Sequence, residues 1–423
     1  MMKDKMQKGY LVILKLFLLV YACKQEEIIS KNGDQNVEDP SSKYVEFLWK
    51  FPLAMDTSER VSMTPVLSNG NVVFTAKILL TPDPARVKCI DTAYRTIVWE
   101  SDDVFMEDCI EISMVDGSGH GVYLNYFATL CDVNPRVIDL TNGDILWDYN
   151  GIGGDGHMCL WNDKFFHSNV TGINPFTHSE IVMSDILTQN FRTVYAVDME
   201  SGYSCHIYPP AVMVNDESDT LLFFQNRQWK SPPYDGKIDF YGYNMSDDIL
   251  LWKLDDINES GNSAVFIPLI HDNKVYFKAG FEVFCFDAET GNIIWEFNPP
   301  SVSDMLLGNL LIEEGKLIVK TSGPELYAIS LETGNIIWEN LNAGETPYSL
   351  TYFEGNIYYV AGGDGKLHVI EVATGKEFWS ILTPNQSESV SFGTTFFNGV
   401  AIDPATRRLY ITDTHFINCF QLK

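Results

Sequence analysis

The chain has 423 residues, of which 45% are apolar, and its formal net charge is −28 at pH 7. This negative field repels phosphate backbones and anionic lipid surfaces, so the composition argues against nucleic acid as a partner. Thirty glycines, 18 prolines and 13% aromatic residues suit many short strands joined by tight turns. We therefore predict an all-β protein.

Residues 1–22 have the pattern of a secretory leader. Three lysines precede an apolar stretch from Leu11 to Val20, which is too short to span a bilayer because a spanning helix needs about 20 residues. The stretch ends in Val20-Tyr-Ala-Cys23, which resembles the lipobox of bacterial lipoproteins. That resemblance implies lipid attachment to Cys23 and an outer-membrane location, on either the periplasmic or the surface side. The alternative is an ordinary secretory signal with an unrelated cysteine.

Residues 23–44 are polar and carry charges of both signs. Such a segment cannot bury enough apolar surface to fold, so we interpret it as a flexible tether. This division leaves residues 45–423 as a single folded domain.

A motif of fixed spacing recurs along that domain, in which a polar residue is followed eight positions later by an aromatic one. The copies run Asp91–Trp99, Asp139–Trp147, Asp198–His206, Asn244–Trp252, Asp287–Trp295, Ser330–Trp338 and Glu371–Trp379. Consecutive polar positions are separated by between 41 residues (Ser330 to Glu371) and 59 residues (Asp139 to Asp198). A period in the forties with a constant internal motif indicates a repeat array.

Each repeat is expected to contain two hairpins. In the copy at 283–298, alternating residues predict one strand up to Asp287 and another from residue 292, joined by a tight turn in which Gly291 supplies a positive φ. Arg95 and Asp248 replace this glycine in two copies, and we expect a different turn at Arg95 because arginine disfavours the left-handed conformation. A second hairpin signal precedes the copies. Each unit is therefore a four-stranded antiparallel sheet, and such sheets repeated around an axis form a β-propeller.

The motif resembles the pyrroloquinoline-quinone-type (PQQ-type) propeller repeat. Residues 326–338, Leu-Tyr-Ala-Ile-Ser-Leu-Glu-Thr-Gly-Asn-Ile-Ile-Trp, match its consensus most fully. The resemblance implies that the tryptophan packs between neighbouring blades. We therefore interpret seven tryptophans as structural repeat residues: Trp49, Trp99, Trp147, Trp252, Trp295, Trp338 and Trp379.

The two ends of the domain supply incomplete repeats. Trp49 lies in a strand pattern without the three strands that should precede it, whereas residues 408–412 and 416–420 predict strands with no tryptophan strand after them. Joining these ends gives an eight-bladed propeller whose last blade is closed by the N-terminal strand. The alternative is seven blades.

The cysteines and histidines do not form a recognisable chemical site. Cys89, Cys285 and Cys419 fall at one repeat position that is otherwise held by small or apolar residues, so we interpret them as packing residues. Cys109 and Cys131 are candidates for a disulfide if the protein is exported. No residue spacing points to a catalytic pair, a metal site or a bound cofactor, and we predict none of the three.

The long connections are the candidate binding elements, because binding residues concentrate on loops held by a rigid scaffold. They are residues 79–87, 171–192 and 227–237. The loop residues Arg227, Trp229, Lys230 and Tyr234 combine bases and aromatics, a composition favoured at interfaces.

Three functions remain in view. The chain resembles the lipid-anchored propellers of the outer-membrane barrel-assembly machinery, which implies a non-catalytic scaffold that is a monomeric ring and binds an envelope protein. A surface receptor for a glycan or peptide is the alternative. A quinoprotein dehydrogenase is disfavoured, because the chain lacks the adjacent-cysteine pair of the enzymes that share this repeat.

Overall fold

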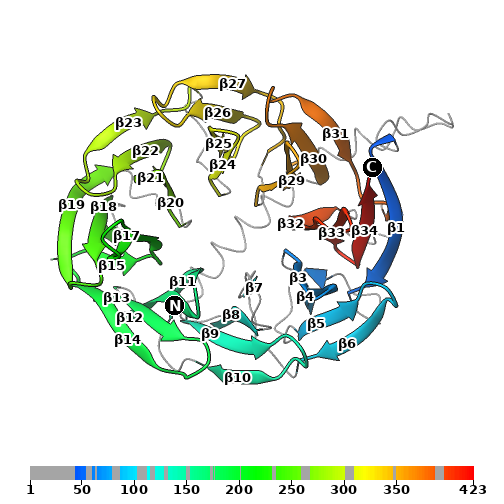
Figure 1. Cartoon of the computed structure of the whole chain (residues 1–423), viewed down its shortest axis with the longest axis horizontal. Coiled ribbons are helices and arrows are strands. Elements are labelled where there is room, and N and C mark those ends of the chain that lie inside the picture. The colour runs from blue at the N-terminus through cyan, green and yellow to red at the C-terminus, as the bar shows by residue number, and fades with distance from the viewer. Residues whose placement is uncertain are drawn as a thin grey trace, which may run out of the picture.

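The computed structural model shows a ring of antiparallel β-sheets (Figure 1). It describes residues 43–53, 60–61, 64–78, 86–101, 112–114, 120–127, 132–148, 153–171, 175, 177–200, 202–230, 235–258, 267–300, 309–345, 349–385 and 395–423. All regular elements in these ranges are strands. None of these segments forms a helix that is long and apolar enough to cross a membrane.

The first four sheets follow one another along the chain, and all their pairings are antiparallel. Sheet 1 contains β2 (Arg60–Val61), β3 (Val66–Ser68), β4 (Asn71–Ile78), β5 (Arg86–Asp91) and β6 (Thr96–Glu100). Sheet 2 contains β7 (Ile112–Met114), β8 (His120–Phe127), β9 (Asp132–Asp139) and β10 (Ile145–Asp148). Sheet 3 contains β11 (Gly153–Trp161), β12 (Lys164–Thr171), β13 (His178–Asp185) and β14 (Phe191–Asp198). Sheet 4 contains β15 (Ser204–Ile207), β16 (Ala211–Val214), β17 (Thr220–Lys230), β18 (Asp235–Asn244) and β19 (Ile249–Asn258).

The remaining sheets complete the ring. Sheet 5 contains β20 (Leu269–His271), β21 (Lys274–Ala279), β22 (Glu282–Asp287) and β23 (Ile293–Phe297). Sheet 6 contains β24 (Leu311–Glu313), β25 (Lys316–Lys320), β26 (Leu326–Ser330) and β27 (Ile336–Asn340). Sheet 7 contains β28 (Thr351–Phe353), β29 (Asn356–Ala361), β30 (Lys366–Glu371) and β31 (Glu377–Ile381). Sheet 8 contains β32 (Phe396–Asp403), β33 (Arg408–Asp413), β34 (Phe416–Leu422) and β1 (Val45–Pro52). The prediction of an all-β propeller built from four-stranded antiparallel sheets is confirmed, and the described strands form eight sheets.

The N-terminal strand closes the ring. β1 pairs with β34 from Val45 opposite Leu422 to Pro52 opposite Phe416, so both ends of the folded chain lie in sheet 8. The expected closure of the last sheet by the N-terminal strand is thus confirmed. The pairing covers the edge of β34 that would otherwise be open to another chain, and β1 becomes the outer strand of sheet 8.

A buried polar cluster fixes this closure. Asp413, which is fully buried, accepts hydrogen bonds from Thr383, Asn385 and Asn418 at 2.7, 2.6 and 2.9 Å. The ammonium group of Lys50 on β1 donates to Oδ1 of Asn385 at 2.7 Å. A buried carboxylate is tolerated only when its acceptor sites are filled in this way. The cluster therefore joins β1, which carries Lys50, to β34 and β33, which carry Asn418 and Asp413.

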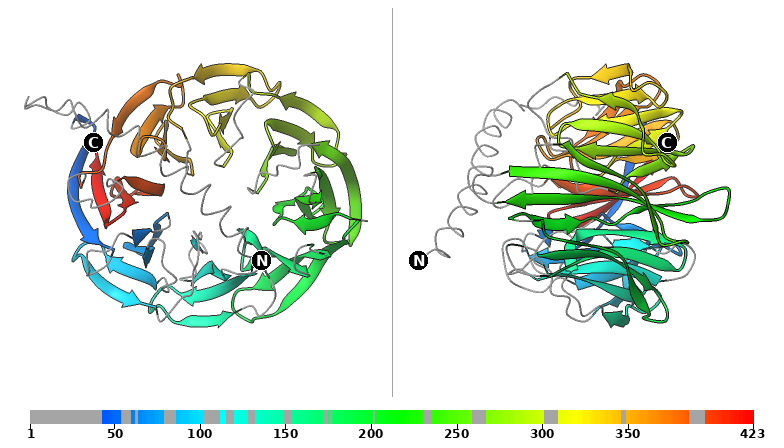
Figure 2. Two further views of the ribbon diagram at one scale, coloured as in Figure 1. Left: turned by 180° about the vertical axis from the view of Figure 1, so that it is seen from behind. Right: turned by 90° about the vertical axis from the view of Figure 1, so that its left-hand side faces the viewer.

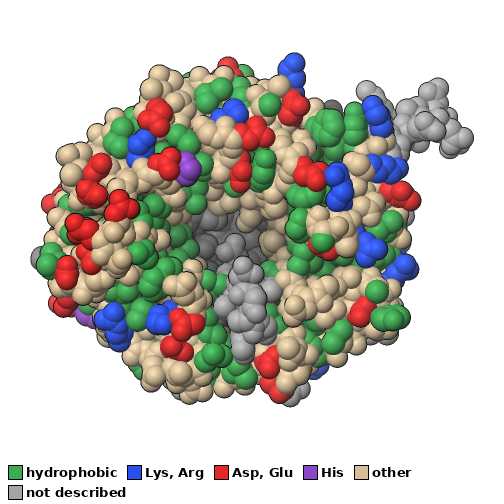
Figure 3. Space-filling model, in the orientation of Figure 1, with side chains coloured by type: hydrophobic (Ala, Val, Ile, Leu, Met, Phe, Trp, Pro, Cys, Tyr) green, Lys and Arg blue, Asp and Glu red, His purple; other side chains and the backbone are tan. Residues whose placement is uncertain are grey.

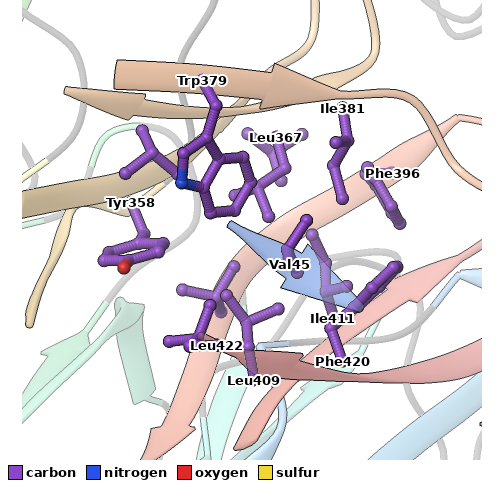
Figure 4. Packing of buried hydrophobic residues seen from close by; sticks show 13 residues of the cluster. Val45, Tyr358, Leu367, Trp379, Ile381, Phe396, Leu409, Ile411, Phe420 and Leu422 are labelled. Atoms are coloured by element: carbon purple, nitrogen blue, oxygen red, sulfur yellow. The ribbon is translucent and has the colours of Figure 1, made fainter. Parts of the chain in front are cut away.

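The hydrophobic core is divided among the boundaries between neighbouring sheets. One cluster joins Trp379 and Leu367 of sheet 7 to Val45, Phe420 and other buried residues of sheet 8 (Figure 4). The other clusters likewise draw their residues from adjacent sheets, which is the packing expected of a repeat array. Acidic side chains are spread over the face seen in Figure 3, in keeping with the net charge.

The motif tryptophans lie at these boundaries, on the outer strand of each sheet that carries one. Each of the seven is paired with a small or apolar residue on the neighbouring strand: Cys419, Cys89, Val137, Gly242, Cys285, Ala328 or Val369. At Gly242 an added Cβ would lie 2.3 Å from the indole of Trp252. The indole thus occupies space that a larger residue would fill, which accounts for the cysteines at this position.

The indole also contacts the turn of the next sheet. Five indole N–H groups donate to the backbone carbonyl of the residue after the motif's polar position in that sheet, at 2.8–3.0 Å: Trp99 to Leu140, Trp147 to Ile186, Trp252 to Ala288, Trp295 to Leu331 and Trp338 to Val372. The motif glycine lies against the same ring. A Cβ added to Gly334, for example, would lie 2.7 Å from Cε3 of Trp295. The glycine is therefore required both for its φ of 68° and for its lack of a side chain.

These bonds correct the third copy of the motif. The indole of Trp147 donates to Ile186, so the turn that follows β13 is the equivalent one and the copy begins at Asp185. The predicted copy from Asp198 to His206 is wrong, because His206 lies on β15 in sheet 4. Thr193 stands eight residues after Asp185 and removes the aromatic signal. The ring of Tyr195 instead packs across this boundary, with its centroid 5.1 Å from that of Phe224 in sheet 4.

The expectation of a different turn at Arg95 is also wrong. Arg95 has a φ of 59° and its N–H donates to the carbonyl of Asp91 at 2.8 Å, as Gly291 does to Asp287 at 2.9 Å. The guanidinium group lies 5.9 Å from the ring centre of Trp49 in sheet 8. A cation–π contact at this distance offsets part of the backbone strain, so arginine replaces the glycine without changing the turn.

Replacing Gly334 by alanine tests the contact with the indole. Gly315→Ala is the matched control, because Gly315 has a φ of 71° but nothing within 4 Å of its added Cβ. Both variants should lose about 1 kcal/mol of unfolding free energy from backbone strain. Gly334→Ala should lose about 1–3 kcal/mol more through overpacking against Trp295. Equilibrium urea unfolding measures the two losses, and equal losses would contradict the contact.

Candidate interaction surface

Sheet 4 is taller than its neighbours. β17 has 11 residues and β18 and β19 have 10 each, whereas the strands of sheet 3 have at most nine and those of sheet 5 at most six. Strands of this sheet extend beyond the neighbouring sheets on one side of the ring in the right-hand view of Figure 2. We call the part of sheet 4 formed by β15, residues 225–230 and residues 235–239 the extension.

The extension exists because the inner strand of sheet 4 is split. β16 pairs with β17 from Thr220 to Phe223, and β15 pairs with it from Asn226 to Trp229. β15 therefore covers the half of β17 that the shorter inner strand could not reach. Hydrogen bonds from Ile207 N–H to Ser179 Oγ, and from Ser168 Oγ to the carbonyl of Ile207, fasten β15 to sheet 3.

The predicted interaction residues lie on this extension. Arg227, Trp229 and Lys230 belong to β17 rather than to a loop, which corrects the sequence prediction, and Tyr234 lies outside the described residues. Side chains alternate along a strand, so Arg227 and Trp229 share one face and Lys230 lies on the other. The prediction of one continuous loop patch is therefore replaced by two faces of a hairpin.

The first face carries a stacked pair. The guanidinium group of Arg227 lies 5.2 Å from the ring centre of Trp229, and both side chains are partly exposed. His206 on β15 is the backbone neighbour of Arg227 and stacks on Tyr208 with 4.6 Å between ring centres. The backbone of Arg227 and Trp229 is already ordered in a paired strand. Binding of a partner would therefore cost little further conformational entropy at these two residues.

The second face is a lysine and tyrosine cluster. The ammonium groups of Lys230 and Lys237 lie 4.6 and 5.7 Å from the ring centre of Tyr203. Lys237 also forms ion pairs with Glu200 at 2.9 Å and Asp256 at 3.4 Å. Although burial favours the neutral amine, the hydrogen bond to Glu200 and the surrounding carboxylates raise the pKa of Lys237. Lys237 therefore remains charged at neutral pH.

A buried carboxylate forms the base of the extension. Asp239 is fully buried and accepts hydrogen bonds from Nε2 of Gln228 at 2.7 Å and from the N–H of Asp256 at 3.1 Å. The ammonium group of Lys253 lies 3.0 Å from Oδ2 of Asp239. Buried hydrogen bonds and ion pairs of this kind hold the carboxylate of Asp239 in one position. The extension is consequently a rigid element rather than a mobile loop.

The two other long connections differ from their prediction. Residues 171–192 contain β13, so they are part of sheet 3 and not an insertion. Residues 79–85 lie outside the described residues, and β5 begins at Arg86.

The described cysteines are packing residues. Cys89, Cys285 and Cys419 are fully buried, and burial raises the pKa of each thiol to about 12. Burial likewise raises the pKa of Cys159 to about 12 and that of Cys205 to about 11. The thiolate, which is the reactive form, is therefore scarce at neutral pH. Cys23, Cys109 and Cys131 lie outside the described residues.

The described part of the chain holds no group of three or more histidine, cysteine, aspartate or glutamate side chains that could bind a metal ion. What the extension offers is a stacked arginine and tryptophan on a rigid hairpin. Arginine and tryptophan are the residue types that most often dominate protein–protein binding energy.

The length of the extension was not readable from the motif, which marks only the turn and the outer strand. One signal was present in the sequence, namely the interval from Asp185 to Asn244, which is 59 residues against 46 from Asp139 to Asp185. The misplaced third motif assigned that excess to the wrong sheet.

Comparison with known proteins supports the repeat assignment. The model of the PQQ_2 family, described as outer membrane protein assembly factor BamB, matches residues 236–413, from β18 into β33. No curated protein matches the chain in sequence.

Several solved structures share the fold. BamB from Moraxella catarrhalis is 15% identical, with a TM-score of 0.55, over 90% of this chain and 98% of that one. The C-terminal WD40 domain of Sif2 is 11% identical, with a TM-score of 0.60, over 90% and 99% of the two chains. A europium-containing methanol dehydrogenase is 10% identical, with a TM-score of 0.60, over 92% and 96%. At these identities the likeness shows the propeller fold alone.

The family match and the geometry agree on the nature of the repeats. The tryptophan, the glycine turn and the small or apolar residue opposite the indole recur within the matched range in sheets 5, 6 and 7. The resemblance to PQQ-type propeller repeats is confirmed, and residues 236–413 carry repeats of that type.

Proposed function

We propose that the protein is a non-catalytic, protein-binding scaffold of the cell envelope that takes part in outer-membrane protein assembly. The match of residues 236–413 to the assembly-factor family supports this role. The neighbours of similar fold include an enzyme and a WD40 domain, so the fold by itself does not choose among these functions.

The observation that carries the proposal is the extension of sheet 4. It places the stacked Arg227 and Trp229 on a strand paired on both sides, above a buried charged base. Rigid presentation of such residues favours binding of a protein partner, because few side chains need to be ordered on association.

The proposal includes an anchor. Residues 1–22 would be removed as a leader, Cys23 would carry the lipid, and residues 23–44 would connect it to the propeller at residues 45–423. A tether of about 20 flexible residues has an average reach of roughly 25 Å. The ring would then stay within reach of the outer membrane without inserting into it.

Metabolic labelling with a palmitate analogue tests the anchor. The wild-type chain should incorporate the label and partition with membranes, whereas Cys23→Ser should do neither, because the proposed attachment atom is the Cys23 thiol. Incorporation of the label by Cys23→Ser would exclude Cys23 as the attachment site.

Crosslinking tests the partner surface. A photo-reactive residue at position 229 in the full chain should crosslink to a component of the barrel-assembly machinery. Arg227→Glu should weaken the captured complex by at least about tenfold, because a hot-spot residue contributes more than about 1.4 kcal/mol.

Arg86→Glu is the matched control, since Arg86 is an exposed arginine in sheet 1. It should leave the complex unchanged. Equal capture by wild type and Arg227→Glu would contradict the surface, and capture of only a glycan or a short peptide would favour a receptor instead.

A further inference from the structure

His368 lies between two carboxylates in sheet 7. Its side chain on β30 is only 5% exposed. Its Nδ1 is 2.7 Å from Oε2 of Glu377, at the start of β31. Its Nε2 is 3.1 Å from Oδ2 of Asp364, in the turn between β29 and β30.

This geometry calls for a protonated ring. Ionised carboxylates only accept hydrogen bonds, so both ring nitrogens must carry a hydrogen to make both contacts. A neutral imidazole has one N–H and one lone pair, which would face a carboxylate oxygen. Loss of the proton therefore breaks one of the two contacts.

The turn that carries Asp364 is held from both sides. The N–H of Gly363 donates to the carbonyl of Glu345, in the connection from sheet 6, at 3.0 Å. The carbonyl of Gly365 accepts from the N–H of Phe396, at the start of sheet 8, at 3.3 Å. The turn at residues 362–365 therefore links three sheets on one side of the ring.

The charged and titratable groups around His368 are few. Tyr359 on β29 stacks on the imidazole with 5.5 Å between ring centres. Lys366 lies 3.8 Å from Asp364, and the side chain of Glu345 lies against Gly363. Three carboxylates and one ammonium group thus surround the imidazole, so protonation of His368 reduces the net negative charge of the site.

We propose that residues 362–365 form a pH-sensitive latch, which is closed while His368 is protonated and released when that proton is lost. Release would free the turn from the connection of sheet 6 and from the start of sheet 8. The latch would thereby change the surface shared by sheets 6, 7 and 8 without opening the ring.

The direction of the pH dependence follows from three groups. Burial lowers the pKa of His368, but the hydrogen bonds to Asp364 and Glu377 outweigh it, so the pKa is raised above 6.5. A raised histidine pKa contributes stability below 6.5 that is lost as the pH rises through the folded value. The hydrogen bond from His368 lowers the pKa of Glu377, and it also lowers that of Asp364 despite burial. Their contribution is complete above about 4.5 and is lost only in stronger acid.

Hydrogen exchange of the full chain, corrected for intrinsic rates, tests the latch. Amide protection of residues 362–365 should fall between pH 6 and pH 9, by about tenfold for each unit by which the pKa of His368 is raised. In His368→Asn the protection should not change with pH. His271→Asn, which removes an exposed histidine paired with Asp272 at 3.3 Å, is the matched control and should behave as wild type.

Glu377→Gln provides a second readout if His368→Asn fails to fold. It removes one carboxylate, so the step in protection should move to lower pH. Absence of a step in wild type, the same step in His368→Asn, or an unmoved step in Glu377→Gln would each overturn the latch.

Discussion

The ring depends on the contact between an indole and a turn. Each motif tryptophan fills the space left by a small or apolar residue on its own sheet, and five of them also hydrogen-bond to the next sheet. Burying such a ring contributes about 2–3 kcal/mol and the hydrogen bond about 1 kcal/mol. Because the contact joins one sheet to the next, it sets the packing between sheets as well as their stability.

The sequence predicted the repeats best where the motif's own tryptophan and glycine form the contact between indole and turn. Sheets 5 and 6 follow the motif residue by residue, so their strands and turns were readable. The third copy was misplaced because Thr193 removes the aromatic marker and Tyr195, two residues later, provides the ring. Arg95 was misjudged because its stabilising partner, Trp49, lies in a sheet closed by the other end of the chain.

The sequence predicted which residue types form the candidate surface, but not how they are arranged. The residue types of Arg227, Trp229 and Lys230 drew attention to the right segment, but their division between two faces depends on strand pairing with β15. The motif reports contacts that recur from sheet to sheet, whereas function depends on the features that distinguish one sheet from the others. The latch at His368 illustrates this limit, since its two carboxylates come from a turn and a strand that the motif does not relate.

A double-mutant cycle on Trp295 and Gly334 tests the central contact most directly. The free energy of unfolding would be measured by urea titration for Gly334→Ala in the wild-type background and in Trp295→Leu. If the indole packs on the turn, the loss caused by Gly334→Ala should shrink in the Trp295→Leu background to that of Gly315→Ala, leaving only the backbone strain. An unchanged loss in the two backgrounds would show that the turn and the indole are not coupled, and would contradict this account of how the ring is held together.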